Sequence, residues 1–506
     1  MIGALLPLLV AVPLFAAGLL TMIGHRPKTH AALMLIVLTA SMGAGVTLVY
    51  VFASGGAAAH GVGLWPFGIA IPFIADMFTA LMLTVTGLLS VVCVWFALAS
   101  HRATSRFFAP LLLVLLAGVN GALLTADLFN LFVFIEVMLL PSYGLFVLAA
   151  QGSAPLRQIA GARLYVTLNL LTSTVFLIGV GFVYGTAGTV NLAELAGAAQ
   201  ADDAVAFAVA VCLFALGIKA SIVPVHGWLA RAYPATSPAI TALFSGLHTK
   251  VAIYAIYRIY AVAFDGASQW LWIGVLVFSA TMLIGVLGAV GESTARSILA
   301  FHMVSQIGYI LMGVALFTEA GLTAGIFYLL HHMIVKASLF LSTGAIEVRY
   351  GTGTIGEPSG IAKREPIIAA AFFVAALSLA GLPPFSGFVA KFSLIFASLE
   401  AAQVVAVVVM LVVSLITLLS MLKIWSGVFW GKNKESDDSP PIQSSTGSVL
   451  TAAPPRINAR LATPAVVLAV ITLGLGIGAE VLLSLSATAA TGLLDPSAYI
   501  EAVTGS

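Results

Sequence analysis

The chain has 506 residues, of which only 8% are charged, against roughly 25% in soluble domains. Hydrophobic residues make up 61%, the mean hydropathy is +1.12 and the formal net charge is +2. This composition leaves too little polar surface for a water-soluble enzyme, so the sequence predicts a protein whose solvent is lipid. The near-zero charge and the lack of a basic tract exclude nucleic acid as a partner, because phosphate binding needs clustered Lys and Arg.

The two cysteines, Cys93 and Cys212, both lie inside apolar runs. We therefore expect neither a disulfide nor a cysteine-based metal site. No nucleotide-binding glycine fingerprint follows a predicted strand, so the sequence predicts no cofactor and no metal. The chain begins with an apolar run that no basic region precedes, which favours a retained spanning helix over a cleaved signal peptide.

Apolar runs bounded by charges, Pro or Gly predict about fourteen transmembrane helices, since a bilayer-spanning helix needs about 20 apolar residues. In chain order they cover residues 3–23, 31–53, 72–99, 107–124, 127–150, 160–185, 204–228, 236–260, 269–290, 294–316, 320–346, 366–399, 402–430 and 463–489. The predicted fold class is therefore an all-α polytopic membrane protein.

Basic residues are distributed unevenly among the connections between these helices. The even-numbered connections and the two termini contain only Arg258, whereas the odd-numbered connections carry fifteen Lys and Arg. The fifteen are Arg26, Lys28, Arg102, Arg106, Arg157, Arg163, Arg231, Arg296, Arg349, Lys363, Arg364, Lys432, Lys434, Arg456 and Arg460. Because cytoplasmic loops are enriched in Lys and Arg, this pattern predicts a multi-pass protein of the cell (plasma) membrane with both termini on the outer side.

Four ionisable residues, Glu136, Lys219, Lys250 and Lys391, fall deep within predicted spans. Each charge costs roughly 2.5–3.5 kcal/mol at the bilayer centre, so function or pairing must offset the cost. For Lys219 and Lys391 the structural alternative is a buried salt bridge that holds helices together. Asp76 lies near the start of a predicted helix, a position more typical of an interfacial cap.

Two of these lysines lie beside predicted helix breaks. Pro224 follows Lys219, and the pair Pro383–Pro384 precedes Lys391. Proline removes a backbone donor and clashes with a carbonyl one turn back, so predicted helices 7 and 12 should kink or unwind there. These two helices cross the membrane in opposite senses in the predicted topology. A broken helix with a lysine, occurring twice and inverted, is typical of an inverted-repeat transporter with its ion path at the breaks.

This reading divides the chain into five parts. They are residues 1–106 with helices 1–3, residues 107–260 as a first five-helix repeat (helices 4–8), residues 269–430 as a second (helices 9–13), residues 431–462 as a cytoplasmic loop, and residues 463–506 with helix 14 and the C-terminus. The loop is rich in Ser, Asp, Pro and Lys, a composition typical of a flexible segment.

Polar side chains recur at helical spacing in several predicted spans, where they would relay protons through side chains and water. The relay candidates are His248, His302, Ser305, Tyr309, His331, His332 and Lys336. Of the two adjacent histidines, one would be a relay member and the other a hydrogen-bonded packing group, with His332 favoured as the relay. For Lys336 the alternative is a pair with a loop acid near the end of its helix.

Six stretches of the sequence resemble the antiporter-like subunits shared by respiratory complex I and Mrp-type cation/proton antiporters. They are DLFNLFVFIEVMLLPSY at 127–143, KASIVPVHGWL at 219–229, PAITALFSGLHTK at 238–250, SQIGY at 305–309, YLLHHMIVKASLF at 328–340 and AGLPPFSGFVAK at 380–391. The resemblance extends over about residues 1–430, and within the family it is closest to the D subunit of the multisubunit Mrp Na⁺/H⁺ antiporter.

The resemblance implies roles for individual residues. Glu136 and Lys219 match the glutamate–lysine pair that governs proton uptake and release in the family, and Lys250 matches its connecting lysine. Lys391 matches the terminal residue on helix 12, where the M-type subunit of complex I has a glutamate. The implied partners are Mrp A, B, C, E, F and G type subunits, lipid, protons and Na⁺ or K⁺.

The resemblance thus implies a proton-translocating subunit of a monovalent cation/proton antiporter that catalyses no covalent chemistry. The alternative is a proton-pumping subunit of a complex I-type quinone oxidoreductase or a membrane-bound hydrogenase. A third possibility is a stand-alone solute carrier or membrane scaffold, which would need either a larger binding cavity or no buried lysines.

Overall fold

The computed structural model describes residues 2–24, 26–148, 155–357, 359–431 and 456–505. Twelve helices in these ranges are long and apolar enough to cross a membrane. They are α1 (Leu8–Ile23), α2 (Pro27–Val51), α3 (Met77–Ala99), α5 (Leu128–Leu148), α6 (Pro155–Ala187), α8 (Asp203–Ala220), α10 (Pro238–Ala263), α11 (Leu271–Gly291), α12 (Ala295–Leu316), α13 (Glu319–Tyr350), α17 (Val404–Ile424) and α18 (Ala459–Ile477).

Shorter helices occupy the two remaining predicted positions: α4 (Phe108–Leu124), and α15 (Pro366–Ala380) continued by α16 (Ser386–Glu400). Two other short helices follow spanning helices that are already counted: α9 (Gly227–Ala232) follows α8, and α19 (Ala479–Leu494) follows α18. Further short elements are η1 (Gly3–Leu5), η2 (Val62–Leu64), α7 (Ala198–Ala201), η3 (Tyr233–Ala235), η4 (Ser268–Trp270), α14 (Ile361–Arg364), the π-helical η5 (Trp425–Phe429) and α20 (Ser497–Thr504). The prediction of an all-α polytopic membrane protein is confirmed.

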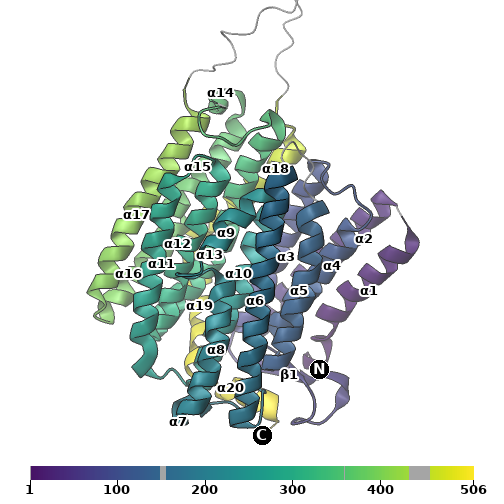
Figure 1. The fold of residues 1–506 in the computed structure, drawn as a ribbon, viewed down its shortest axis with the longest axis vertical. Coiled ribbons are helices and arrows are strands. Elements are labelled where there is room, and N and C mark those ends of the chain that lie inside the picture. The colour runs from purple at the N-terminus through teal and green to yellow at the C-terminus, as the bar shows by residue number, and fades with distance from the viewer. Residues whose placement is uncertain (1, 25, 149–154, 358, 432–455, 506) are drawn as a thin grey trace, which may run out of the picture.

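The helices form one bundle with three of them at its centre (Figure 1). Helices α10, α12 and α13 are buried along nearly their whole length, whereas only about a third of the residues of α1, α2, α11 and α17 are buried. Most exposed side chains on these outer helices are apolar, as in Phe15 and Val405. A helix that is apolar on its outer face is suited to lipid, so the polar residues of the central helices are shielded from lipid by the bundle itself.

Both breaks predicted from proline are present. Helix α8 ends at Ala220, where Ser221 adopts a left-handed conformation (φ 68°), and α9 begins only at Gly227. Helix α15 ends at Ala380 before Gly381 (φ 89°), and α16 begins at Ser386. A third interruption was not predicted, because a single glycine is tolerated inside helices: Gly478 separates α18 from α19.

The predicted helix 72–99 is wrong at its start. Residues Pro72–Asp76 form strand β2, which pairs antiparallel with β1 (Ala57–Gly61). Helix α3 begins after Asp76, whose carboxylate accepts a hydrogen bond from the Thr79 backbone N–H at 3.0 Å. The predicted cap is therefore confirmed. The small β-hairpin contacts α20, at the end of the bundle where both termini lie (Figure 1).

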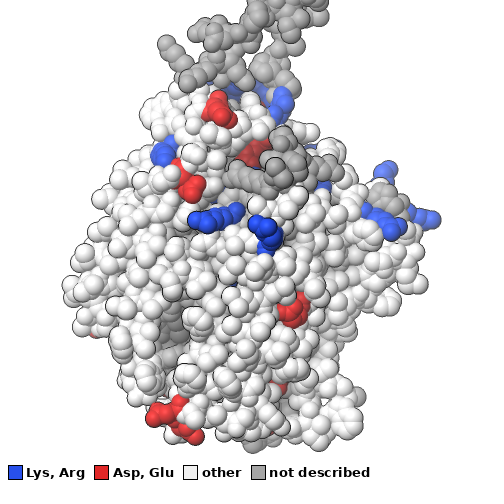
Figure 2. All heavy atoms as spheres, viewed as in Figure 1, with Lys and Arg blue, Asp and Glu red and all other residues white. Residues whose placement is uncertain are grey.

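The basic residues lie toward the opposite end of the molecule from the termini. On the face shown in Figure 2, Lys and Arg gather in the upper part, whereas the lowest part shows acidic side chains. Arg258, the exception in the loop count, is not a loop residue: it lies in α10 and is 3% exposed. Its Nη2 atom pairs with Asp76 Oδ2 at 2.6 Å. Arg258 is therefore not a basic loop residue and does not count against the predicted distribution of basic loops.

The five-part division and the repeat boundaries remain predictions. Residues 432–455 of the predicted loop lie outside the described residues, and α18 begins at Ala459, before the predicted start at 463.

Candidate functional site

Four lysines lie inside the bundle, on four different helices. Lys219 of α8, Lys250 of α10, Lys336 of α13 and Lys391 of α16 are at most 4% exposed. Within the described ranges the side-chain ion pairs at salt-bridge distance are Asp76–Arg258 and Arg296–Glu347, so none of the four lysines has a carboxylate in direct contact. Among the described residues, neither a buried salt bridge at Lys219 or Lys391 nor a loop acid paired with Lys336 is present.

Lys219 instead contacts a neutral amide. Its Nζ atom donates to Asn169 Oδ1 of α6 at 3.4 Å, and the Asn169 amide donates to the Tyr165 carbonyl at 2.8 Å. Glu136 of α5 is partly buried, and its charge acts on Lys219 without a direct bond. One of its carboxylate oxygens, Oε1, is buried with no partner among the described residues. The predicted pair is therefore within electrostatic range but not in direct contact.

His248 connects this pair to the centre of the bundle. Its Nδ1 atom lies 3.0 Å from the Tyr165 hydroxyl, which lies 3.1 Å from Ser142 Oγ. The charge of Lys219 acts on the His248 ring, whose Nε2 atom is buried and without a partner in the described part of the chain. Because His248 and Lys250 are two residues apart on α10, this helix links the surroundings of Lys219 to those of Lys250.

The ionisable side chains from Glu136 to Lys391 are referred to as the row. Its middle consists of Lys250, Lys336 and His332. Lys250 Nζ donates to Thr249 Oγ1 at 3.1 Å, and Lys336 Nζ donates to the Leu299 carbonyl at 2.7 Å. The charges of both lysines act on His332, and Lys250 also acts on Lys336. Neither ring nitrogen of His332 has a partner within the described ranges. His332 is therefore within electrostatic range of both lysines, and both of its ring nitrogens are available.

The row ends at Lys391. Its Nζ atom donates to the Ala380 carbonyl and to Ser414 Oγ, each at 2.9 Å. The charge of Lys391 acts on His302 and His331, and the charge of Lys336 also acts on His302. His331 is the hydrogen-bonded member of the adjacent pair, with Nδ1 2.8 Å from Ser386 Oγ.

Ser305 and Tyr309 are buried on α12, but their hydroxyls bond to backbone carbonyls and not to the other candidates. Ser305 donates to the Met282 carbonyl at 2.9 Å, and Tyr309 donates to the Met410 carbonyl at 2.5 Å. The Tyr309 ring also faces the ammonium of Lys391, whose Nζ lies 5.3 Å from the ring centroid. A cation over an aromatic face is stabilised by the ring quadrupole, so the position of Tyr309 favours the charged form of Lys391.

The second helix break explains how a charge is tolerated at Lys391. The last four carbonyls of a helix have no partner within that helix. The Ala380 carbonyl at the end of α15 accepts from both Lys391 and Ser414 Oγ. At the first break, the Ile218 carbonyl accepts instead from Trp228 Nε1 at 3.0 Å. The break thus supplies Lys391 with a carbonyl acceptor that an uninterrupted helix would have used internally.

Several contacts were not anticipated from the sequence. Asn169, Tyr165, Ser386 and Ser414 all contact predicted site residues, and Ser142 contacts Tyr165. A weak signal exists for two of them, because Tyr165 and Asn169 are one helical turn apart in an otherwise apolar span. In the described ranges no group of three or more His, Cys, Asp or Glu side chains is arranged to hold a metal ion.

Comparisons with known proteins agree with the fold and the motifs. A model of the family described as "NADH:quinone oxidoreductase/Mrp antiporter, TM" matches residues 125–417. The chain is 37% identical over 450 residues to the D subunit of the Na⁺/H⁺ antiporter of Alkalihalophilus pseudofirmus, covering 87% of both chains.

Two solved structures also contain chains that are similar to this one. A chain in the structure of the Mrp complex from Dietzia sp. is 56% identical, covers 100% of both chains and superposes with a TM-score of 0.94. A chain of an archaeal membrane-bound sulfane sulfur reductase superposes with a TM-score of 0.85 over 99% of both chains, at 24% identity, which shows a shared fold. This chain therefore belongs to the NADH:quinone oxidoreductase/Mrp antiporter family of membrane subunits, and within it resembles the D subunits of Na⁺/H⁺ antiporters.

Proposed function

We propose that this chain moves protons through the membrane as one subunit of a multisubunit antiporter that exchanges a monovalent cation, Na⁺ or K⁺, for protons. The observation that carries the proposal is the row of buried ionisable groups from Glu136 to Lys391. Charges act between neighbours within each half of the row, on Lys219 and His248 in the first half and on His332 and His302 in the second, and α10 joins the two halves. Buried charges inside a membrane are costly, and they typically mark ion or proton pathways.

Unpartnered polar atoms in the row support a hydrated path. The buried atoms without partners among the described residues include Glu136 Oε1, His248 Nε2, and both ring nitrogens of His302 and of His332. A buried polar group without a partner costs about 1–3 kcal/mol, so each of these atoms favours a water molecule beside it. Water between these side chains would join them into a continuous proton relay.

The relay would run on electrostatic coupling. While the Glu136 carboxylate is close, it stabilises the proton on Lys219. When the two separate, burial disfavours the lysine charge and the proton leaves through His248 toward Lys250. A proton that arrives at Lys250 repels one on Lys336, and the repulsion passes through His332 and His302 to Lys391.

This function involves no covalent reaction, so the chain is a transporter subunit and not an enzyme. Its partners would be the A, B, C, E, F and G type subunits of the same complex, in the plasma membrane. The excess of basic residues in the loops opposite the termini supports an orientation with both termini outside.

The test is an assay of the purified complex in proteoliposomes. Proton exchange that depends on Na⁺ or K⁺, in the absence of any electron donor, is the expected result. Proton transport that requires quinone-linked or ferredoxin-linked electron transfer would refute the antiporter function and favour a redox-driven pump.

A further inference from the structure

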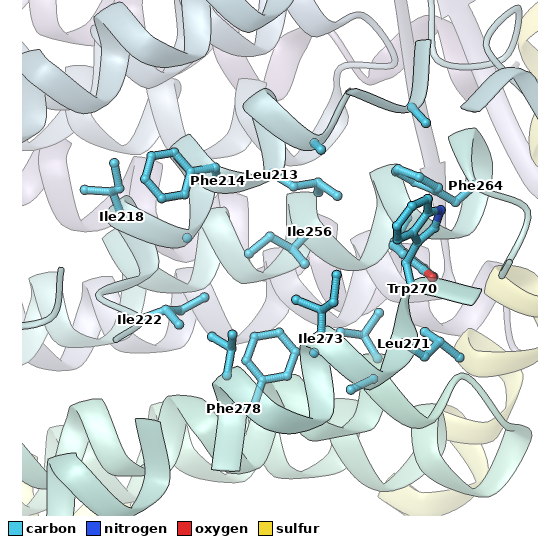
Figure 3. Close-up of a pocket in the computed structure, with 18 of the residues that line it drawn as sticks. Leu213, Phe214, Ile218, Ile222, Ile256, Phe264, Trp270, Leu271, Ile273 and Phe278 are labelled. Carbon is cyan, nitrogen blue, oxygen red and sulfur yellow. The ribbon is translucent and has the colours of Figure 1, made fainter. Parts of the chain in front are cut away.

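An apolar groove of about 740 Å³ lies between α8 and α11 (Figure 3), and no lysine is among the described residues that line it. Its walls are formed by Phe207 and Phe214 of α8, Ile256 of α10, and Ile273 and Phe278 of α11. Phe207 is 69% exposed and Phe214 is 56% exposed, so the groove opens sideways at the surface of the bundle. We refer to it as the α8–α11 groove.

The groove extends from one membrane interface into the hydrocarbon region. At one end it is lined by Asp203, Tyr260 and Trp270, and at the other by residues 222–225 of the helix break. Tyr and Trp are enriched at membrane–water interfaces. Helix α8 runs from Asp203 to Ala220, which is about 26 Å at 1.5 Å per residue. A ligand that fills the groove would therefore have its polar end at Asp203 and its apolar end beside the break.

The break presents an apolar surface to the groove because its backbone is satisfied from inside the bundle. The Val223 N–H donates to Thr281 Oγ1 of α11 at 3.2 Å, and the Ile222 N–H donates to the Gly217 carbonyl at 3.0 Å. The side chains of Ile218, Ile222 and Val223 line the groove. Apolar cavities favour apolar occupants over water, so this end of the groove is suited to hydrocarbon.

The size of the groove distinguishes between a lipid chain and a neighbouring helix. A spanning helix of about 30 Å length and 10 Å diameter occupies roughly 2,400 Å³, several times the volume of the groove, so a neighbouring helix would cover the groove without entering it. Pockets for molecules of modest size hold about 300–1,000 Å³, a range that includes this one. The mouth carries Asp203, and no Lys or Arg is among the described residues that line the groove. The negative charge of Asp203, with no basic side chain to offset it, disfavours an anionic headgroup.

We propose that the α8–α11 groove is a lipid-binding site that holds one acyl chain of a zwitterionic phospholipid. The lipid comes from the leaflet on the side of the two termini. Its acyl chain packs against Ile218 and Ile222 and covers the break that follows Lys219. This inference goes beyond the transport function, because it assigns a ligand and a site that proton movement does not require.

The test uses the intact complex in vesicles that contain phosphatidylcholine with a photoreactive group on its acyl chain. After irradiation, the labelled peptides are mapped by mass spectrometry. We expect adducts on α8 and α11 residues of the groove. Ala210→Phe, which fills the groove from α8, should reduce this labelling at least fivefold. Ala40→Phe, a matched change at an exposed position of α2 outside the groove, should leave it unchanged.

Three results would overturn the proposal. Equal labelling of the parent and Ala210→Phe would mean that the label does not come from the groove. Unlabelled α8 and α11 in the assembled complex would mean that a neighbouring subunit covers the groove. Displacement of the probe by phosphatidylglycerol more readily than by unlabelled phosphatidylcholine would refute the zwitterionic headgroup. Ala210→Leu replaces the phenylalanine variant if that variant does not assemble. Labelling does not depend on transport, so the result is separable from that of the exchange assay.

Discussion

Among the described residues, Asn169 is the single side chain that accepts a hydrogen bond from Lys219 Nζ, and we expect it to orient the lysine. A hydrogen bond to a charged group contributes about 1.5–3 kcal/mol, which corresponds to at least a tenfold change in an equilibrium. We expect Asn169→Leu to slow cation-dependent proton exchange about tenfold or more in proteoliposomes, with normal assembly of the complex.

The matched control for Asn169 lies on the same helix. Thr174→Val removes an exposed hydroxyl that bonds only to its own helix, at the Leu170 carbonyl, and should leave the exchange rate unchanged. A rate for Asn169→Leu equal to that of the control would show that the amide does not position Lys219.

The buried ion pair between Asp76 and Arg258 stabilises the end of the bundle near the termini. The Arg258 guanidinium also lies 4.7 Å from the Tyr499 ring centroid of α20, and burial raises the pKa of the Tyr499 hydroxyl well above its ordinary value. Removing one member of a buried pair leaves an uncompensated charge and typically costs about 3–5 kcal/mol. Asp76→Asn should therefore lower the temperature at which the purified complex loses this subunit.

The second ion pair serves as the comparison. Arg296 and Glu347 pair at 2.7 Å with side chains 15% exposed, so water compensates part of the loss, and Glu347→Gln should destabilise the complex less than Asp76→Asn. Equal loss of stability in the two variants would contradict this assignment. The double variant Asp76→Leu, Arg258→Met should regain part of the stability, because an apolar pair of similar volume leaves no buried charge.

At the level of individual residues, the sequence was most informative where a charge stood in an apolar run. Lys219, Lys250 and Lys391 could be recognised because a charge is rare at that depth. Ser386 and Ser414 could not, because neutral polar residues are common in membrane helices and these two contact their partners only through the packing of helices. Their roles depend on tertiary contacts between helices.

The interrupted helices position the chemistry at the scale of secondary-structure elements. Gly387, near the start of α16, packs so closely against α15 that a Cβ atom there would overlap the Ser378 carbonyl oxygen. Overpacking typically costs about 1–3 kcal/mol. Gly387→Ala should therefore push α16 away from α15, weaken the contact between Lys391 and the Ala380 carbonyl, and reduce exchange about tenfold.

A glycine with free space around it controls for the loss of backbone flexibility. A Cβ atom added at Gly181 of α6 would meet no neighbouring atom within 4 Å, so Gly181→Ala should leave exchange and assembly unchanged. Full exchange activity in Gly387→Ala would contradict the role given to the close contact between α15 and α16.

The predicted elements were correct where a proline or a charge marked an end. Pro224 and the pair Pro383–Pro384 identified both breaks, because proline is poorly tolerated within a helix. The hairpin was missed because the apolar run from residue 72 continues without interruption into α3. The helix α20 was missed because its eight residues are too short to produce a clear periodic signal.

At the scale of the whole molecule, the distribution of basic residues predicts the orientation in the membrane. We expect a membrane-impermeant maleimide applied to intact cells to label Ser268→Cys, between α10 and α11, and not Thr104→Cys, between α3 and α4. Both positions are exposed, and both native cysteines are buried. The reverse labelling pattern would place the termini in the cytoplasm.

At this scale the few described charges have two locations. On the face shown in Figure 2 the basic residues gather toward one end of the bundle, and four lysines lie buried inside it, where the helices shield them from lipid. The order of the row could not be read from the sequence, because it depends on the packing of α10 against α13 and of α13 against α16.

The central claim is that protons pass through Lys219. The most direct measurement is sodium-driven proton exchange by the reconstituted complex carrying Lys219→Ala, compared with the parent complex at equal assembly and without an electron donor. We predict that exchange falls to the level of vesicles that lack the complex. Exchange at the full parental rate would contradict the account.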